Sequence, residues 1–129
     1  MEMVRAPNQF DVIVTNNLFG DIVTDLGAQL QGGIGLAASG NIHPGKCGLF
    51  EPVHGSAPTI AGQGIANPMA AVLTAGMMLG WLDNSALETQ IESAVAACLH
   101  ADIVTAELGG SYSTSEVGDA ILRELDKSN

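Results

Sequence analysis

Positive charge is scarce in this sequence. Its 129 residues include only four lysines and arginines against 14 aspartates and glutamates, which gives a formal net charge of −10. Proteins that follow a nucleic-acid backbone gather several cations on one surface, because each phosphate is neutralised by a Lys or Arg. The four cations are spread along the chain, at Arg5, Lys46, Arg123 and Lys127. We therefore expect no nucleic acid among the partners.

Long hydrophobic runs and cysteine motifs are also missing. No apolar stretch reaches the roughly 18 residues of a membrane-spanning helix, and no basic segment followed by an apolar one opens the chain. A cytoplasmic protein without a membrane partner is the default expectation. Cys47 and Cys98 stand far apart without a CxxC spacing, which excludes a thiolate zinc site and favours two reduced cysteines over a disulfide.

Two catalytic signatures are absent as well. The glycines form no GxGxxG dinucleotide fingerprint, and no Ser-His-Asp order or nucleophile elbow supports covalent hydrolysis. What the chain does have is 47% hydrophobic residues, 16 glycines and a length that suits one domain. We therefore expect residues 1–129 to form a single region of the α/β class.

Hydrophobic periodicity predicts the order of the elements. The β-branched run at 10–15 (FDVIVT) is typical of a buried parallel strand. Apolar residues then recur every four positions over 18–30, which predicts a helix directly after that strand. A glycine-rich loop follows, with short strands expected near 34–38 and 48–53 and a turn over 41–48.

The later helices begin at residues with capping chemistry. Asn67 followed by Pro68 is a strong helix start, and the stretch after it, 69–82, is apolar almost all round. A serine with a glutamate three residues later predicts two further helices: Ser85 with Glu88 for 85–100, and Ser113 with Glu116 for a last helix ending near Leu125. So few strands beside so many helices indicate part of a larger sheet domain.

Asp21 and Asp25 are four residues apart in GDIVTD, so on a helix their carboxylates share one face. Two like charges at this spacing repel, and a divalent cation would offset the repulsion. Mg²⁺ and Mn²⁺ prefer carboxylate oxygens and usually keep positions for water and substrate oxygens. Spacing alone leaves open a second interpretation, two solvated acids near a helix start. Asn16 and Asn17 would add neutral oxygens or amide donors at the expected strand end.

The segment 51–68 (EPVHGSAPTIAGQGIANP) carries no charge after Glu51. Its glycines let the backbone approach a ligand closely, and free amides ahead of a helix N-terminus donate to an anion such as a phosphate. A structural turn before a well-capped helix is the alternative interpretation. His54 would stack on or hydrogen-bond to an adenine, or else serve the fold, and Glu51 would be a site acid or an ordinary turn carboxylate.

Three segments, NNLFGDIVTD, GLFEPVHGSAPTIAGQGIANP and ELGGSYSTSE, together resemble the β-decarboxylating dehydrogenase family, which includes isopropylmalate, isocitrate, homoisocitrate and tartrate dehydrogenases. The resemblance runs nearly end to end and is greatest to the isopropylmalate dehydrogenases. It implies a non-Rossmann α/β architecture, of which this chain would be the C-terminal segment only. The implied reaction is a metal-dependent and NAD(P)-dependent oxidative decarboxylation of a 2-hydroxy dicarboxylic acid, first of all 3-isopropylmalate in leucine biosynthesis.

The resemblance also implies roles for particular residues. Asp21 and Asp25 match the family's two metal-binding aspartates in GDxxxD, with Mg²⁺ or Mn²⁺ as the metal. Fourteen consecutive residues match the family's cofactor loop: His54, Gly55, Ser56, Ala57, Pro58, Thr59, Ile60, Ala61, Gly62, Gln63, Gly64, Ile65, Ala66 and Asn67. His54 and Asn67 are expected near the adenine. No catalytic residue of the family is matched within the chain.

Thr59 departs from the family pattern. Isopropylmalate dehydrogenases usually carry an aspartate there that bonds the 2′-hydroxyl of the adenosine ribose, whereas NADP-dependent isocitrate enzymes carry Lys-Tyr at positions 59 and 60. Thr59 and Ile60 provide neither the acid that rejects a 2′-phosphate nor a cation that attracts one. The resemblance implies NAD as the cofactor, and the neutral residues at these two positions leave NADP open.

The extent of the chain is a larger departure. Family members are considerably longer, and their substrate arginines, catalytic tyrosine, catalytic lysine and a further metal aspartate would all lie upstream of Met1. We therefore expect the chain alone to be inactive on its small-molecule substrate. The resemblance also implies a homodimer for the full-length enzyme, since 10–15 and the helix after it match segments near the family's subunit contact. The rival hypothesis is a truncated, non-catalytic module for nucleotide binding or interaction.

Overall fold

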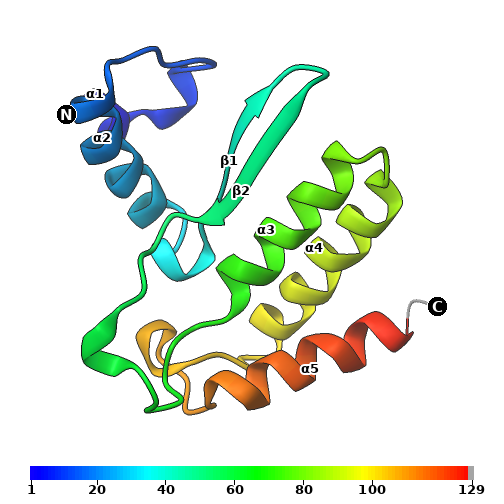
Figure 1. Ribbon diagram of the computed structural model, residues 1–129. Helices are drawn as coiled ribbons and strands as arrows, with labels where there is room; N and C mark the ends of the chain where they lie inside the picture. The colour runs from blue at the N-terminus through cyan, green and yellow to red at the C-terminus, as the bar shows by residue number, and fades with distance from the viewer. Residues whose placement is uncertain (128–129) are drawn as a thin grey trace.

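In the computed structural model, which describes residues 1–127, three C-terminal helices form the core. Helix α3 (Met69–Trp81) and helix α4 (Ser85–His100) lie side by side, and α5 (Thr114–Lys127) crosses below them (Figure 1). Their buried side chains are almost all aliphatic or small, and they form one cluster to which all three helices contribute. The helices expected from capping and periodicity are thus confirmed in number and place.

Two of the expected helix starts also have the expected hydrogen bonds. The Asn67 side-chain oxygen accepts from the Met69 N–H at 3.0 Å, as a capping asparagine does. Ser113 and Glu116 form a complete capping box: the Ser113 N–H and Oγ donate to Glu116 Oε2 at 2.8 and 2.7 Å, and the Glu116 N–H donates to Ser113 Oγ at 3.3 Å.

The capping box predicted at Ser85 and Glu88 is wrong. Helix α4 does begin at Ser85, but no side chain caps it. The Glu88 carboxylate instead fills the space beside Gly80 where a Cβ would stand. Because the short turn from α3 to α4 brings that glycine close, Glu88 packs across to α3 and leaves the amides at the start of its own helix.

An antiparallel hairpin lies between α2 (Asn17–Leu30) and α3 (Figure 1). Its strands are β1 (Ala38–His43) and β2 (Cys47–Pro52), with Ala38 opposite Pro52 and His43 opposite Cys47. One face of the hairpin packs on α3, where the rings of Phe50 and Trp81 lie 5.8 Å apart. The hairpin thus joins the helical core to α2.

The first of these strands begins later than the sequence predicted. Residues 34–36 form a turn of 3-10 helix, and β1 continues into the segment expected to be a turn. Only 44–46 remain for the connection, and Gly45 closes it with a φ of 71°. Pairing with β2 decides this boundary, since the ladder extends as far as partners are available.

The predicted parallel strand at 10–15 is wrong for the residues that the structure describes. The segment is not part of a sheet, and its side chains are exposed, Val12 at 82% and Val14 at 92%. A strand forms only beside another strand that shares its N–H and C=O groups. Within residues 1–127 the only described sheet is the hairpin, and the segment pairs with neither of its strands.

Helix α2 confirms the helix predicted after that segment. Its cap was missed: the Asn16 side-chain oxygen accepts from the Phe19 N–H at 3.2 Å. A short helix, α1 (Glu2–Arg5), lies near it at the N-terminus (Figure 1). Four single turns of 3-10 helix complete the described chain: η1 (Pro7–Gln9), η2 (Ile34–Leu36), η3 (Pro58–Ile60) and η4 (Ala106–Leu108).

Both cysteines are free thiols, as expected. Cys47 is exposed on the hairpin, whereas Cys98 is buried in the helical core, and this burial raises the pKa of the Cys98 thiol. Among residues 1–127, no helix is long and apolar enough to cross a membrane.

Candidate metal and nucleotide site

Asp21 and Asp25 lie on one face of α2, as their spacing predicts. With Asn17, one turn earlier, they line a hollow of about 470 Å³, the aspartate hollow. Asn16 lies outside it, because its side-chain oxygen caps α2. Of the two asparagines at the start of the helix, only Asn17 therefore presents its side chain to this hollow.

The opposite wall of the aspartate hollow comes from the hairpin. Ser39 is paired with Glu51 across the ladder, and Asn41, two residues further along β1, faces the same side. All three line the hollow. Sequence reasoning named Glu51 but missed Ser39 and Asn41, because it placed Asn41 in a turn. The alternation of side chains along a strand would have found both, had the strand been placed correctly.

The aspartate hollow has the donor chemistry of a site for a hard cation, with an incomplete ligand set. Carboxylate and amide oxygens are the ligands that Mg²⁺ and Mn²⁺ prefer. Within residues 1–127, however, no three His, Cys, Asp or Glu side chains converge closely enough to hold a metal ion. Asp21 and Asp25 therefore fit one side of such a site, and its other ligands would have to come from water, substrate or another polypeptide segment.

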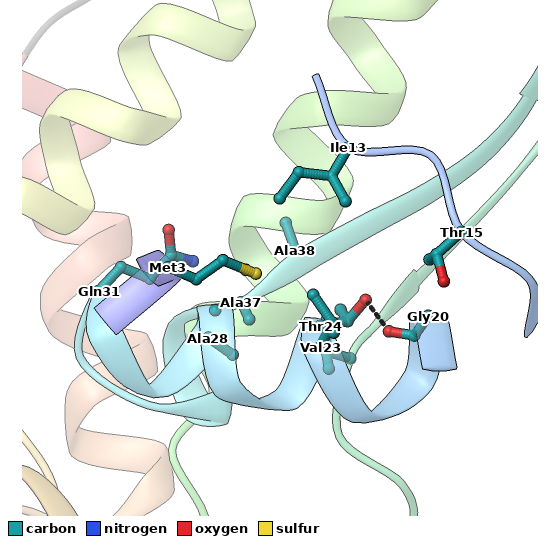
Figure 2. A pocket seen from close by; sticks show the side chains of 12 residues that line it. Met3, Ile13, Thr15, Gly20, Val23, Thr24, Ala28, Gln31, Ala37 and Ala38 are labelled. Carbon is teal, nitrogen blue, oxygen red and sulfur yellow. Dashed lines mark hydrogen bonds between the residues drawn. The ribbon is translucent and has the colours of Figure 1, made fainter. Parts of the chain in front are cut away.

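A second hollow, on another face of α2, has a different character. It measures about 400 Å³, and its lining comes from the N-terminal segment, from α2 and from the start of β1, with Met3, Ile13 and Ala38 among the residues that border it (Figure 2). Thr24 borders it, but its hydroxyl donates to the Gly20 carbonyl at 2.7 Å within the helix (Figure 2). This hollow is mainly apolar and offers no carboxylate or histidine to a cation.

Residues 54–67, the expected cofactor segment, form a loop between β2 and α3 and are called loop 54–67 below. Gly62 and Gly64 have φ values of 77° and 68°, the left-handed region in which glycine is the favoured residue. Ala57 shares that region at 42° in spite of its Cβ, a strain of the kind that gathers at ligand-binding loops. The loop therefore depends on its glycines for its shape.

Loop 54–67 borders a hollow of about 560 Å³, the loop hollow. Most of the predicted cofactor residues line it: His54, Gly55, Ser56, Ala57, Ile60, Ala61, Gly62, Gly64 and Ala66. The others do not: Pro58, Thr59, Gln63, Ile65 and Asn67. Two residues that sequence reasoning did not single out, Thr114 and Ser115, complete the lining from the start of α5.

Thr114 also ties the loop to α5. Its N–H donates to the Gly64 carbonyl at 2.8 Å, and its hydroxyl donates to the Ala66 carbonyl at 2.5 Å. Thr114 and Ala66 are 48 positions apart, so no local signal in the sequence joins them. These contacts give the second half of the loop a fixed support.

Asn67 turns away from the loop hollow. Asn67 is buried, with 6% of the residue exposed. Its amide oxygen accepts from the Met69 N–H, and its amide nitrogen donates to Glu107 Oε1 at 3.1 Å. Thr59 is exposed and supplies its carbonyl to the Gln63 side chain at 2.9 Å. The Asn67 and Thr59 side chains therefore lie outside the loop hollow, whereas His54, the other residue expected near the adenine, lines it.

The aspartate hollow and the loop hollow meet at His54 and Gly55, which line both. His54 Nδ1 lies 3.0 Å from the Gly55 carbonyl oxygen, so the tautomer with a proton on Nδ1 donates to it. His54 Nε2 is buried and has no hydrogen-bond partner in the described structure. A buried polar atom without a partner is a group that a bound ligand can satisfy.

Among the described residues, no positive charge lines the aspartate hollow or the loop hollow. No Lys or Arg of the described residues borders either one. Arg5 and Lys127 instead form ion pairs of 2.6 Å with Glu2 and Glu124 in their own helices. An anion in the loop hollow would therefore be bound by backbone amides and hydroxyls, and a substrate carboxylate would need cations from outside the chain.

Comparison with known proteins gives a consistent result. The profile of the isocitrate/isopropylmalate dehydrogenase family matches residues 1–121. The chain is 51% identical to the 3-isopropylmalate dehydrogenase of Caulobacter vibrioides over 127 residues, which cover 97% of the chain and 36% of that protein. It is 50% identical to the homoisocitrate dehydrogenase of Methanocaldococcus jannaschii, with 98% and 36% covered.

A solved structure agrees with these sequence relatives. The crystal structure of isocitrate dehydrogenase from Methylococcus capsulatus matches with a TM-score of 0.91 at 44% identity, covering 97% of this chain and 38% of that one. The fold is thus shared with a protein of the same group. The chain spans little more than a third of the length of each of these relatives.

Proposed function

Because this chain belongs to the isocitrate/isopropylmalate dehydrogenase family, we propose that it is the C-terminal segment of an enzyme that oxidises and decarboxylates a 2-hydroxy dicarboxylic acid. One observation carries the proposal: the aspartate hollow and the loop hollow meet at His54 and Gly55. Hydride transfer to a nicotinamide cofactor needs the substrate and the dinucleotide side by side, and adjoining hollows of these two chemistries meet that need.

Asp21 and Asp25 hold one side of a bound Mg²⁺ or Mn²⁺ in this proposal. Such a cation, when bound, supplies Lewis-acid chemistry toward the hydroxyl and keto oxygens of the substrate. The part played by the chain is to fix two carboxylates on one face of a capped helix and to leave the rest of the hollow open. Asn17 and Glu51 line the same hollow and set the polarity around the substrate oxygens.

Loop 54–67 takes the adenine nucleotide portion of the cofactor. Its glycines keep the backbone free of side chains, so amides can donate to phosphate oxygens without a cation nearby. NAD is the proposed cofactor. Thr59 is neutral and exposed, so it offers no carboxylate to reject a 2′-phosphate, and NADP is the alternative.

For the substrate we propose 3-isopropylmalate first, as in leucine biosynthesis. Relatives of this name from Caulobacter vibrioides and Zymomonas mobilis are both 51% identical to the chain. Homoisocitrate and isocitrate are the alternatives, because relatives at 50% identity carry those names. Binding the carboxylates that these acids share calls for cations, and neither the aspartate hollow nor the loop hollow contains any. The isolated chain is therefore proposed to be inactive.

A homodimer of the full-length enzyme is also proposed. Helix α2 carries exposed apolar side chains, Leu18 at 68% and Ile22 at 62%, and so does the segment before it, at Val12 and Val14. Exposed apolar residues in such number favour a place where another polypeptide packs. This surface lies on the same helix as the aspartates, so a partner there would stand close to the proposed metal site.

The test is a hybrid enzyme in which this chain replaces the matching 127-residue segment of the Caulobacter vibrioides protein. We expect it to reduce NAD or NADP with 3-isopropylmalate and Mn²⁺, and we expect Asp21→Asn to remove nearly all of this turnover. Asp119→Asn on α5, exposed and outside both hollows, is the matched control. A folded hybrid that oxidises none of the three acids contradicts the proposed function, and an active Asp21→Asn hybrid contradicts the metal role.

A further inference from the structure

Three segments far apart in the sequence meet behind loop 54–67. Glu107, in η4, accepts a hydrogen bond from the Asn67 side-chain nitrogen at 3.1 Å, across 40 positions of sequence. Gly35, in η2, packs against both of these side chains. The junction therefore joins the end of the loop to η2 and to η4. It lies outside the aspartate hollow and the loop hollow.

Glu107 fixes which way the Asn67 amide points. With the carboxylate accepting from Asn67 Nδ2, the amide oxygen is directed at the Met69 N–H, which it meets at 3.0 Å. The flipped amide would place an oxygen against the carboxylate and an NH₂ group against an N–H donor, so both contacts would be lost. Asn67 is buried, with 6% exposure, whereas Glu107 is exposed, so water reaches the carboxylate but has little access to the amide.

Gly35 makes room for this arrangement. A Cβ at that position would overlap the Glu107 carboxylate and would lie 3.1 Å from the Asn67 Cβ. The glycine-rich segment after α2 thus has a structural use that its composition alone did not indicate. The missing side chain at Gly35 lets η2 pack closely enough for the Glu107 carboxylate to lie against both η2 and Asn67.

We propose that Glu107 is a positioning residue for loop 54–67: through Asn67 it fixes the last residue of the loop on the first turn of α3, so that the loop presents its backbone amides in one arrangement. The role in nucleotide binding rests on the proposed function. The effect on the order of the loop does not, because it follows from contacts within the chain. Thr114 holds the loop at Gly64 and Ala66, and Glu107 holds the residue that follows.

The experiment compares four variants of the chain. Glu107→Ala removes the acceptor, and Glu107→Gln keeps a side-chain oxygen at the same length. Asn67→Asp retains the cap on Met69 but sets two carboxylates against each other. The double variant Asn67→Asp with Glu107→Gln restores one donor between the two side chains, with the direction of the hydrogen bond reversed.

The first measurement is hydrogen exchange of the amides of residues 55–66, followed by NMR, which needs no ligand. We expect Glu107→Ala and Asn67→Asp to speed exchange in the loop by about tenfold, the size of effect given by a buried donor or acceptor left unpaired. Glu107→Gln and the double variant should stay within about threefold of the original chain. Unchanged exchange in Glu107→Ala, or no recovery in the double variant, would overturn the proposal.

Two controls separate positioning from general loss of stability. Val95→Ala opens a space in the helical core on the α4 side and lowers global stability without removing any hydrogen bond of the loop. Glu92→Ala removes an exposed carboxylate from the same helix. Neither should speed exchange in residues 55–66 ahead of the rest of the chain. If Val95→Ala does so as strongly as Glu107→Ala, the role is structural and the proposal is wrong.

The second measurement uses the hybrid enzyme and keeps the two proposals apart. We expect Glu107→Ala to raise the KM for NAD by about tenfold and to change kcat little, since the reacting groups are untouched. Glu107→Gln should recover the original KM. A hybrid with no dehydrogenase activity contradicts the proposed function alone. An active hybrid whose KM is unmoved by Glu107→Ala contradicts the positioning role alone.

Discussion

Thr114, at the start of α5, donates its backbone N–H to the carbonyl oxygen of Gly64 at 2.8 Å. A second hydrogen bond runs from its hydroxyl to the Ala66 carbonyl at 2.5 Å. Both carbonyls belong to loop 54–67, so one residue of a distant helix supports the second half of the loop. The capping box of Ser113 and Glu116 fixes the first turn of α5 and hence the place from which Thr114 reaches the loop.

Replacing the Thr114 hydroxyl should weaken this support. Thr114→Val keeps the size of the side chain and the backbone N–H but leaves the Ala66 carbonyl without its donor, and we expect a loss of about 1 kcal/mol in the free energy of unfolding. Thr114→Ser retains the donor and should lose less. Urea unfolding followed by circular dichroism measures both. Equal stability of the valine and serine variants would show that the hydroxyl contributes nothing.

Removing one of the paired aspartates should have opposite effects with and without a divalent cation. Without a cation, Asp25→Asn should raise stability by roughly 0.2 to 0.5 kcal/mol, because two like charges four residues apart on a helix repel. With millimolar Mn²⁺ the original chain should gain stability through binding, and the variant should not. Thermal unfolding at both conditions tests this. A Tm increase of equal size in both proteins would contradict binding at these aspartates, and Asp119→Asn is the control for charge alone.

Stability should fall at acid pH in part through Glu116. Hydrogen bonds from the Ser113 N–H and hydroxyl favour the charged carboxylate, so the pKa of Glu116 is lower in the folded chain than in the unfolded one. The unfolded chain therefore binds more protons in this range. The contribution of Glu116 is fully present above the ordinary glutamate pKa of about 4.3 and is lost as the pH falls through the lower folded value.

The matched variant for this prediction is Glu116→Gln, which cannot titrate. The stability difference between the original chain and Glu116→Gln should be constant from neutral pH down to about pH 5 and should shrink below the ordinary glutamate pKa of about 4.3. Urea unfolding across that range measures it, at low salt because the side chain is exposed. Glu92→Gln, on the exposed part of α4, should leave the acid-dependent loss in place. A difference independent of pH would refute the assignment to Glu116.

Two glycine-to-alanine changes should act in opposite directions. A Cβ on Gly110 would overlap the backbone carbonyl oxygen of Val104, which cannot move aside as a flexible side chain can, so we expect Gly110→Ala to cost more than about 2 kcal/mol. A Cβ on Gly118, inside α5, would meet nothing within 4 Å. Gly118→Ala should therefore raise stability by roughly 0.5 to 1 kcal/mol. Denaturant unfolding of the pair settles both signs.

Local signals predicted the helices well. Asn67 and the pair Ser113 and Glu116 satisfy amides within their own first turns, so neighbouring residues carry all the information needed. Ser85 and Glu88 have the same spacing and form no box, since Glu88 packs beside Gly80 of α3. The spacing of residues in the sequence determines which capping hydrogen bonds can form, and the packing of the neighbouring helix determines which of them do form.

The strands were harder to predict because their partners lie elsewhere in the chain. The run at 10–15 has the composition of a buried strand, yet it is exposed and pairs with no strand of the described residues. Asn41 was expected in a turn and is in β1, since the ladder with β2 extends past it. A strand is defined by hydrogen bonds to another segment, and composition cannot supply that segment.

By itself, the sequence determined the parts of this protein that depend on neighbours along the chain: where helices begin, that Asp21 and Asp25 share one helix face, and that a glycine-rich loop precedes α3. The tertiary structure alone decided which of these parts meet. It placed Ser39 and Asn41 across from the aspartates, set Thr114 against the loop and turned Asn67 toward Glu107. The reason is physical: helix periodicity and capping are local, whereas these contacts depend on how elements pack after the chain has folded back on itself.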